Sequence, residues 1–169
     1  MAVFSAAKCG KQNAAAMARV IDYVEQEKKT LWEGRRLITG VNCVAQSAYT
    51  EMMTTKRRYH KTDGMMFYHF SQSFPEDVER TPLQIHAIGL KLAQKLFPGY
   101  EVVVATHVDT DHLHNHFVVN SVNCVTGRKL HQNAADLQRQ REINDEICVA
   151  HGLEILEPAN RYGRSNGMS

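Results

Sequence analysis

The sequence lacks the features that mark a secreted or membrane-spanning protein. Its four cysteines are scattered through 169 residues without a Cys-x-x-Cys pair, which argues against a disulfide framework or a cysteine zinc site. No apolar run approaches the roughly 18 residues that a membrane span requires, and residues 1–10 lack the apolar core of a signal peptide. These absences predict a soluble, cytoplasmic protein that keeps its thiols free.

The sequence also has no internal repeat and no low-complexity tract. Hydrophobic residues make up 43% and charged residues 22% of it, values near the globular average that exclude a fibre or a wholly disordered chain. The net charge of +2 is unevenly spread: residues 1–64 hold 11 Lys or Arg against 6 Asp or Glu, whereas residues 65–169 hold 9 against 12. The basic first third is compatible with binding a polyanion on one face.

Apolar spacing and turn residues predict an alternation of helices and strands. Helices are expected over residues 12–29, 45–61, 81–96 and 133–150, and strands over residues 1–7, 65–74, 100–107, 112–122 and 153–156. Residues 30–44 are expected to be mostly loop. The order favours an α/β fold, a two-layer sandwich with a central, mostly antiparallel five-stranded sheet flanked by helices.

Histidines are concentrated in one short segment. Four of the nine fall within ten residues, His107–His116. If residues 112–120 form a strand, then His112, His114 and His116 share one face, because side chains alternate along a strand.

The residues just before that strand add a further histidine and two carboxylates. A hairpin brings His107 back across from His114 and His116, and three converging imidazoles make a metal site with an open coordination position. Asp109 and Asp111 stand where a carboxylate could hold the outer N–H of a ligand histidine. The segment therefore predicts a metal centre, although its spacing names neither the metal nor the reaction.

The same segment carries a family resemblance. Residues 107–120, HVDTDHLHNHFVVN, resemble the third signature motif of the relaxase/mobilisation nucleases, a family of the HUH endonuclease superfamily. The resemblance implies that the metal ligands are His107, His114 and His116. The residue between the last two is here an asparagine, where the general pattern is hydrophobic. His112 lies inside the motif but is not expected to be a direct ligand.

Two further stretches resemble motifs of this family. Residues 14–30, AAAMARVIDYVEQEKKT, resemble the first motif, in which a helical tyrosine is the nucleophile, and this tyrosine is Tyr23. Residues 67–74, FYHFSQSF, resemble the second motif. The second-motif residues that the resemblance places near DNA are His69, Ser71 and Ser73.

The resemblance covers roughly residues 1–157. For this range it implies a relaxase nuclease domain with the palm-like sheet of the HUH endonucleases, and residues 158–169 are expected to begin a linker to a further C-terminal region. The implied partners are single-stranded or hairpin DNA at a transfer origin, accessory mobilisation proteins, and a coupling protein with its secretion system.

The implied reaction is site- and strand-specific nicking by transesterification. The tyrosine oxygen attacks the scissile phosphate, which leaves a 5′-phosphotyrosine and a free 3′-hydroxyl for later religation. A phenol has a pKa of about 10, so the nucleophile needs a nearby base or cation, and Asp109 is the expected second catalytic residue. A divalent ion stabilises charge on the phosphate; Mg²⁺ or Mn²⁺ is expected in function, and Zn²⁺ or Ni²⁺ also suits three histidines.

Basic residues outside the motifs are candidates for contacts with DNA. A basic run ends the second predicted helix, where it is either a solvated end favoured by the helix dipole or a phosphate-binding patch. Tyr59, within this run, offers a stacking surface for a base and is the alternative nucleophile. The basic DNA-binding candidates are Lys56, Arg57, Arg58, Arg128 and Lys129.

Three other functions share parts of this pattern. A rolling-circle replication initiator has the same histidine pair, although the order of the three motifs favours a relaxase. A metal-containing DNA-binding protein would bind DNA without a covalent adduct. A hydrolytic metalloenzyme using bound water would need no tyrosine at all.

Overall fold

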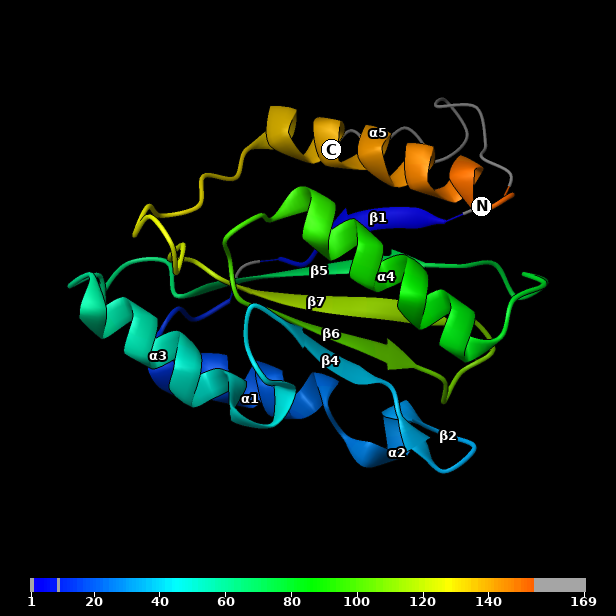
Figure 1. The fold of residues 1–169 in the computed structure, drawn as a ribbon, viewed down its shortest axis with the longest axis horizontal. Helices are drawn as coiled ribbons and strands as arrows, with labels where there is room; N and C mark the ends of the chain where they lie inside the picture. The colour runs from blue at the N-terminus through cyan, green and yellow to red at the C-terminus, as the bar shows by residue number, and fades with distance from the viewer. Residues whose placement is uncertain (1, 9, 154–169) are drawn as a thin grey trace.

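The centre of the fold is a five-stranded antiparallel sheet with the strand order β1-β5-β7-β6-β4. A computed structural model describes residues 2–8 and 10–153 of the chain. The strands of the sheet are β1 (Val3–Ala6), β4 (Ile38–Val41), β5 (Phe67–Ser73), β6 (Val102–His107) and β7 (His114–Asn120). Figure 1 shows β7 in the middle of the sheet and β1 at one edge. The predicted α/β sandwich around an antiparallel sheet is confirmed.

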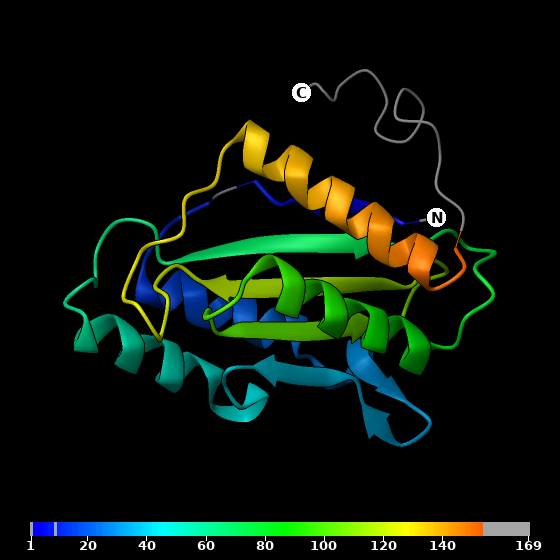
Figure 2. The same ribbon diagram turned by 45° about the horizontal axis from the view of Figure 1, so that its top comes forward.

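Helices cover both faces of the sheet, so there is a third layer beyond the two predicted. The helices are α1 (Ala14–Val24), α2 (Glu27–Thr30), α3 (Ala48–Arg58), α4 (Pro82–Leu96) and α5 (Ala134–Ala150). On one face, Phe70 and Phe117 pack with Ile88 of α4; on the other, Val118 packs with Ile21 of α1. Figure 2 shows α1 behind the strands and α4 and α5 in front. In the part of the chain that the structure describes, no helix is long and apolar enough to cross a membrane.

Residues 30–44 are not the loop that the sequence predicts. They contain a short hairpin, β2 (Leu31–Trp32) with β3 (Arg35–Arg36), and then β4, which pairs with β6 at the sheet edge. Their polar and glycine residues are typical of turns, and β4 forms only through long-range pairing. Gly40 is needed in this strand because a Cβ would lie 2.1 Å from the carbonyl oxygen of Cys43.

The helix predicted over residues 12–29 is also interrupted. α1 ends at Val24, the chain turns through Glu25 and Gln26, and α2 follows. The other three predicted helices are confirmed, and those beginning after Thr81 and Asn133 both start with a capping box. Apart from Leu153, the predicted strand over residues 153–156 lies outside the described residues, as do the domain boundary at residue 157 and the linker.

A buried polar network fixes β7 from the α4 side of the sheet. The side-chain amide of Asn115 donates to Gln72 Oε1 at 2.8 Å and to the carbonyl oxygen of Ile85 at 2.9 Å, and its Oδ1 accepts from Thr106 Oγ1. Gly89 of α4 leaves room for this amide, because a Cβ there would lie 2.6 Å from Asn115 Nδ2. The asparagine between the two histidines thus holds their strand in place from behind.

Gly89→Ala is therefore expected to lower the free energy of unfolding by about 2 kcal/mol. Alanine gains up to about 1 kcal/mol of helix propensity over glycine, but overpacking and loss of the buried amide bonds outweigh this gain. Urea unfolding measures the change. Gly10→Ala is the matched control, because a Cβ at Gly10 meets nothing within 4 Å; a stabilised Gly89→Ala protein would contradict the role given to the network.

Candidate metal centre and nucleophile

Three histidines converge at the ends of β6 and β7. In the strand register His107 is opposite His114, and His116 is opposite Ala105, so all three side chains lie on the face that α1 covers. One nitrogen from each ring lies within 4.8 Å of the others. His112 is not part of this cluster, and its Nδ1 is 3.2 Å from the carbonyl oxygen of Phe74. The sequence-predicted set of converging histidines is confirmed.

Backbone carbonyls orient two of the rings. His107 Nε2–H donates to the carbonyl oxygen of Val24 at 3.0 Å, and His114 Nδ1–H donates to that of His112 at 2.9 Å. With these protons assigned from the hydrogen bonds, His107 Nδ1 and His114 Nε2 keep free lone pairs. The expectation that Asp109 or Asp111 performs this task is wrong, because main-chain oxygens already occupy the outer nitrogens.

His116 is the most constrained of the three. Its Nδ1 is 2.8 Å from His69 Nε2, and its Nε2 is buried without a hydrogen-bond partner within residues 2–8 and 10–153. Burial lowers the pKa of His116 to about 2 and that of His107 to about 4. Both rings are therefore neutral at pH 7, which is the form that binds metal. These two rings and His114, whose Nε2 keeps a free lone pair, present three nitrogen donors that fit a divalent ion with an open position for a substrate.

Tyr23 stands beside these histidines, in the last turn of α1. Its neighbours on the helix, Ile21 and Val24, are buried in the core, whereas Tyr23 is 46% exposed. The phenol ring lies edge-on to His107 and His116, with centroid distances of 5.9 and 6.5 Å. The predicted nucleophile thus lies off the apolar stripe and next to the candidate metal ligands.

A family model described as "Relaxase: MobA/VirD2-like, nuclease domain" matches residues 23–153. The chain belongs to this relaxase family. The match begins at the tyrosine that the first motif provides and includes all three histidines.

Several relatives of this relaxase domain are longer proteins. It is 40% identical over 140 residues to "Protein rlx" of Staphylococcus aureus, which is 83% of this chain and 40% of that protein. It is 32% identical over 118 residues to "Group II intron-interrupted relaxase LtrB" of Lactococcus lactis subsp. cremoris, covering 60% of this chain and 21% of that protein. It is 27% identical over 149 residues to "Protein TraI" of Escherichia coli, covering 86% and 19%. The chain therefore spans less than half the length of these relatives.

The second-motif residues of the relaxase domain lie on the face of the sheet that carries the three histidines. Ser71 is opposite His116 and Ser73 is opposite His114 in the register of β5 with β7. His69, two residues earlier on β5, contacts His116 directly. The structure thus brings His69, Ser71 and Ser73 beside the candidate metal centre.

The basic residues predicted to bind DNA lie elsewhere. α3 ends at the left of Figure 1, far from the end of β6 that carries His107. Along the seven residues of β7 the two ends of the sheet are about 20 Å apart. Tyr59, at the far end, donates through its hydroxyl to the carbonyl oxygens of Cys124 and Val125 at 3.3 and 3.2 Å. The alternative nucleophile is therefore not brought to the histidines.

The prediction that Lys56 contacts DNA is wrong. Its side chain is fully buried, and its ammonium donates to the carbonyl oxygen of Met66 at 2.6 Å, to Ser121 Oγ at 3.0 Å and to Asn120 Oδ1. Burial lowers the pKa of Lys56 to about 7. Arg57, Arg58 and Arg128 are exposed, and Lys129 donates to the carbonyl oxygen of Asp63 at 2.8 Å.

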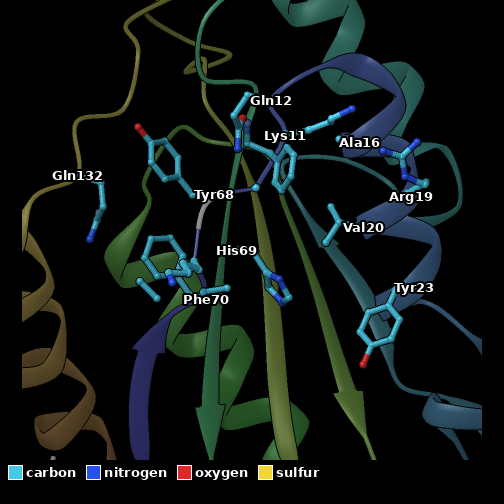
Figure 3. A pocket seen from close by; sticks show the side chains of 15 residues that line it. Lys11, Gln12, Ala16, Arg19, Val20, Tyr23, Tyr68, His69, Phe70 and Gln132 are labelled. Atoms are coloured by element: carbon cyan, nitrogen blue, oxygen red, sulfur yellow. Dashed lines mark hydrogen bonds between the residues drawn. The ribbon is translucent and has the colours of Figure 1, made fainter. Parts of the chain in front are cut away.

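A pocket of about 540 Å³ opens beside Tyr23 and His69, between α1 and the ends of β1 and β5. Figure 3 shows His69 reaching from the sheet towards α1 and Tyr23 on the helix side, with Lys11 at the other end of the pocket. Among the described residues that line the pocket, Lys8, Lys11 and Arg19 are basic, and none is Asp or Glu. Sequence reasoning missed these three cations, although the basic charge of residues 1–64 was a signal for them.

His69→Phe is expected to weaken metal binding by roughly 10- to 100-fold, because it removes the group that orients the His116 ring. Titration calorimetry with Mn²⁺ measures this, and the exposed residue His131 provides the control, His131→Ala. Unchanged Mn²⁺ affinity in His69→Phe would mean that the 2.8 Å contact does not hold the ligand.

Proposed function

We propose that this domain nicks one strand of DNA at a transfer origin by transesterification, with Tyr23 as the nucleophile. The observation that carries the proposal is the position of the exposed Tyr23 phenol, edge-on to two of the three converging histidines. The relaxase family of the chain supports the same reaction class.

The chain's own groups fit the steps of this reaction. Tyr23 Oη forms a bond to phosphorus as the bond from phosphorus to the 3′ oxygen breaks, the phenol loses its proton, and the 3′ oxygen gains one. A divalent ion on His107, His114 and His116 would neutralise charge on the phosphate oxygens. Because the phosphodiester energy is kept in the tyrosine ester, the same groups can catalyse religation.

The substrate strand is proposed to enter through the pocket beside Tyr23. Lys8, Lys11 and Arg19 offer positive charge to successive phosphates, and the Tyr68 ring in the same pocket offers a stacking surface for a base. Ser71 and Ser73 would then contact the strand near the scissile phosphate. Among the earlier candidates, Arg57, Arg58, Tyr59, Arg128 and Lys129 would form a second contact region at the far end of the sheet.

We also propose that this domain acts in the mobilisation of DNA. Relatives named relaxase support a role in mobilisation, in which the domain works in the cytoplasm with a transfer-origin hairpin, accessory mobilisation proteins and a coupling protein. Mg²⁺ or Mn²⁺ is the proposed physiological ion, and three imidazoles also suit Zn²⁺ or Ni²⁺.

The test is incubation of the 169-residue chain with single-stranded oligonucleotides carrying the origin of its own element, in Mn²⁺ or Mg²⁺. The expected result is an adduct that survives SDS and whose nucleotide maps to Tyr23. Cleavage without an adduct would replace the relaxase with a hydrolase, and binding without cleavage would leave a DNA-binding protein.

A further inference from the structure

Lys29 lies over the ring of Tyr23, where a continuous helix would not place it. Six residues along an α-helix put two side chains about 120° apart around the axis and about 9 Å apart along it. Here α1 ends at Val24, and the turn before α2 folds the chain back. Lys29 Nζ is consequently 5.1 Å from the centroid of the Tyr23 ring.

The main chain and the side chain of Lys29 are both anchored to the turn that follows β6. Its carbonyl oxygen accepts from the amide of Val108 at 2.7 Å, directly after the metal-ligand candidate His107. Its ammonium pairs with Asp109 Oδ2 at 3.2 Å, and its side chain is 18% exposed. The Lys29 ammonium is therefore held at the histidine end of the sheet. It remains partly accessible to solvent.

The Tyr23 ring connects Lys29 with the histidines. One side of the ring's surroundings is the Lys29 ammonium at 5.1 Å, and the His107 and His116 rings lie 5.9 and 6.5 Å from the same ring.

We infer that Lys29 is a catalytic residue of the proposed nicking reaction, its ammonium group binding a non-bridging oxygen of the scissile phosphate beside Tyr23. An ammonium has three N–H donors; one is engaged by Asp109, and two remain for the phosphate. As the tyrosine Oη–P bond forms and the P–O3′ bond breaks, negative charge grows on the non-bridging oxygens. A fixed cation there stabilises the transition state more than the bound substrate.

In this arrangement Asp109 is a positioning residue. Its carboxylate holds Lys29 and has no task of its own in proton transfer. A purely structural role explains the pair less well, because a partly exposed ion pair adds little to folding stability and the Val108–Lys29 main-chain bond already ties α2 to the turn.

The test measures single-turnover adduct formation and the reverse joining reaction in Lys29→Met, Lys29→Arg and Lys28→Met. Lys28→Met is the matched control, because Lys28 is exposed on the same short helix. Lys29→Met is expected to slow cleavage and joining by the same factor, about 100-fold or more. Arginine should restore the rate to within about tenfold, and Mn²⁺ and oligonucleotide affinities should stay within about threefold of wild type.

Asp109→Asn distinguishes positioning from proton transfer. It should slow cleavage in the wild-type background but add nothing to Lys29→Met, since both changes remove the same interaction. An additive loss in the double variant would give Asp109 an independent role and overturn its positioning assignment.

The inference rests on the proposed function, and the same assay separates their failures. If the wild-type protein forms no adduct, both the proposed function and this inference are wrong. A wild-type adduct with an equally fast Lys29→Met protein, or a Lys29→Met protein that has lost Mn²⁺ binding, would overturn the inference about Lys29 alone.

Discussion

Tyr23→Phe is expected to abolish the covalent protein–DNA adduct and strand cleavage with it. The substitution removes one hydroxyl and keeps the ring, which lies edge-on to the histidines in a residue that is 46% exposed. The fold, Mn²⁺ affinity and DNA affinity should therefore survive. Denaturing gel electrophoresis of the protein with labelled oligonucleotide measures the adduct, and calorimetry measures the retained metal binding.

Tyr59→Phe is the matched control for this experiment, since it deletes the same atom at the other end of the sheet. Its hydroxyl bonds to two main-chain carbonyls, so its loss should lower stability slightly and leave the adduct intact. An adduct that persists in Tyr23→Phe and disappears in Tyr59→Phe would keep the reaction class but move the nucleophile to the end of α3.

The sequence could predict the histidine cluster because local rules decide it. The period of two along β7 puts His114 and His116 on one face, and a hairpin with β6 returns His107 to them. Tyr23 could be placed for a similar reason, since its offset from the apolar stripe of α1 is visible in the helical period.

Tertiary contacts decide what the sequence could not predict. The basic run at the end of α3 reads as a solvated surface, yet Lys56 points inward. The carbonyl oxygen of Met66, just before β5, and side-chain oxygens of Asn120 and Ser121, at the end of β7, bind it there. The partners of Asp109 were predicted wrongly because the nearest acceptors for the histidines are main-chain oxygens. Lys29 was missed because its place above Tyr23 depends on the break between α1 and α2.

A large loss of metal binding is expected from His116→Ala. It removes the proposed ligand whose Nε2 is buried without a hydrogen-bond partner among the described residues, and two imidazoles alone no longer fix an ion in a defined geometry. Mn²⁺ affinity should fall by at least about 100-fold and the adduct should disappear, whereas oligonucleotide affinity should change little, because phosphate contacts and stacking carry it. Titration calorimetry and a binding assay without metal measure the two affinities.

His107→Ala and His114→Ala are expected to behave like His116→Ala, and His112→Ala provides the matched control. His112 belongs to the same histidine-rich segment, but its ring faces the carbonyl oxygen of Phe74 and its Nε2 is 4.0 Å from Glu76. Its removal should leave Mn²⁺ affinity near the wild-type value. If His112→Ala loses metal as completely as His116→Ala, His112 belongs to the ligand set, and the assignment of His107, His114 and His116 as the three ligands is wrong. If only His116→Ala loses metal, the orphaned nitrogen is a ligand but the other two rings serve to position the substrate.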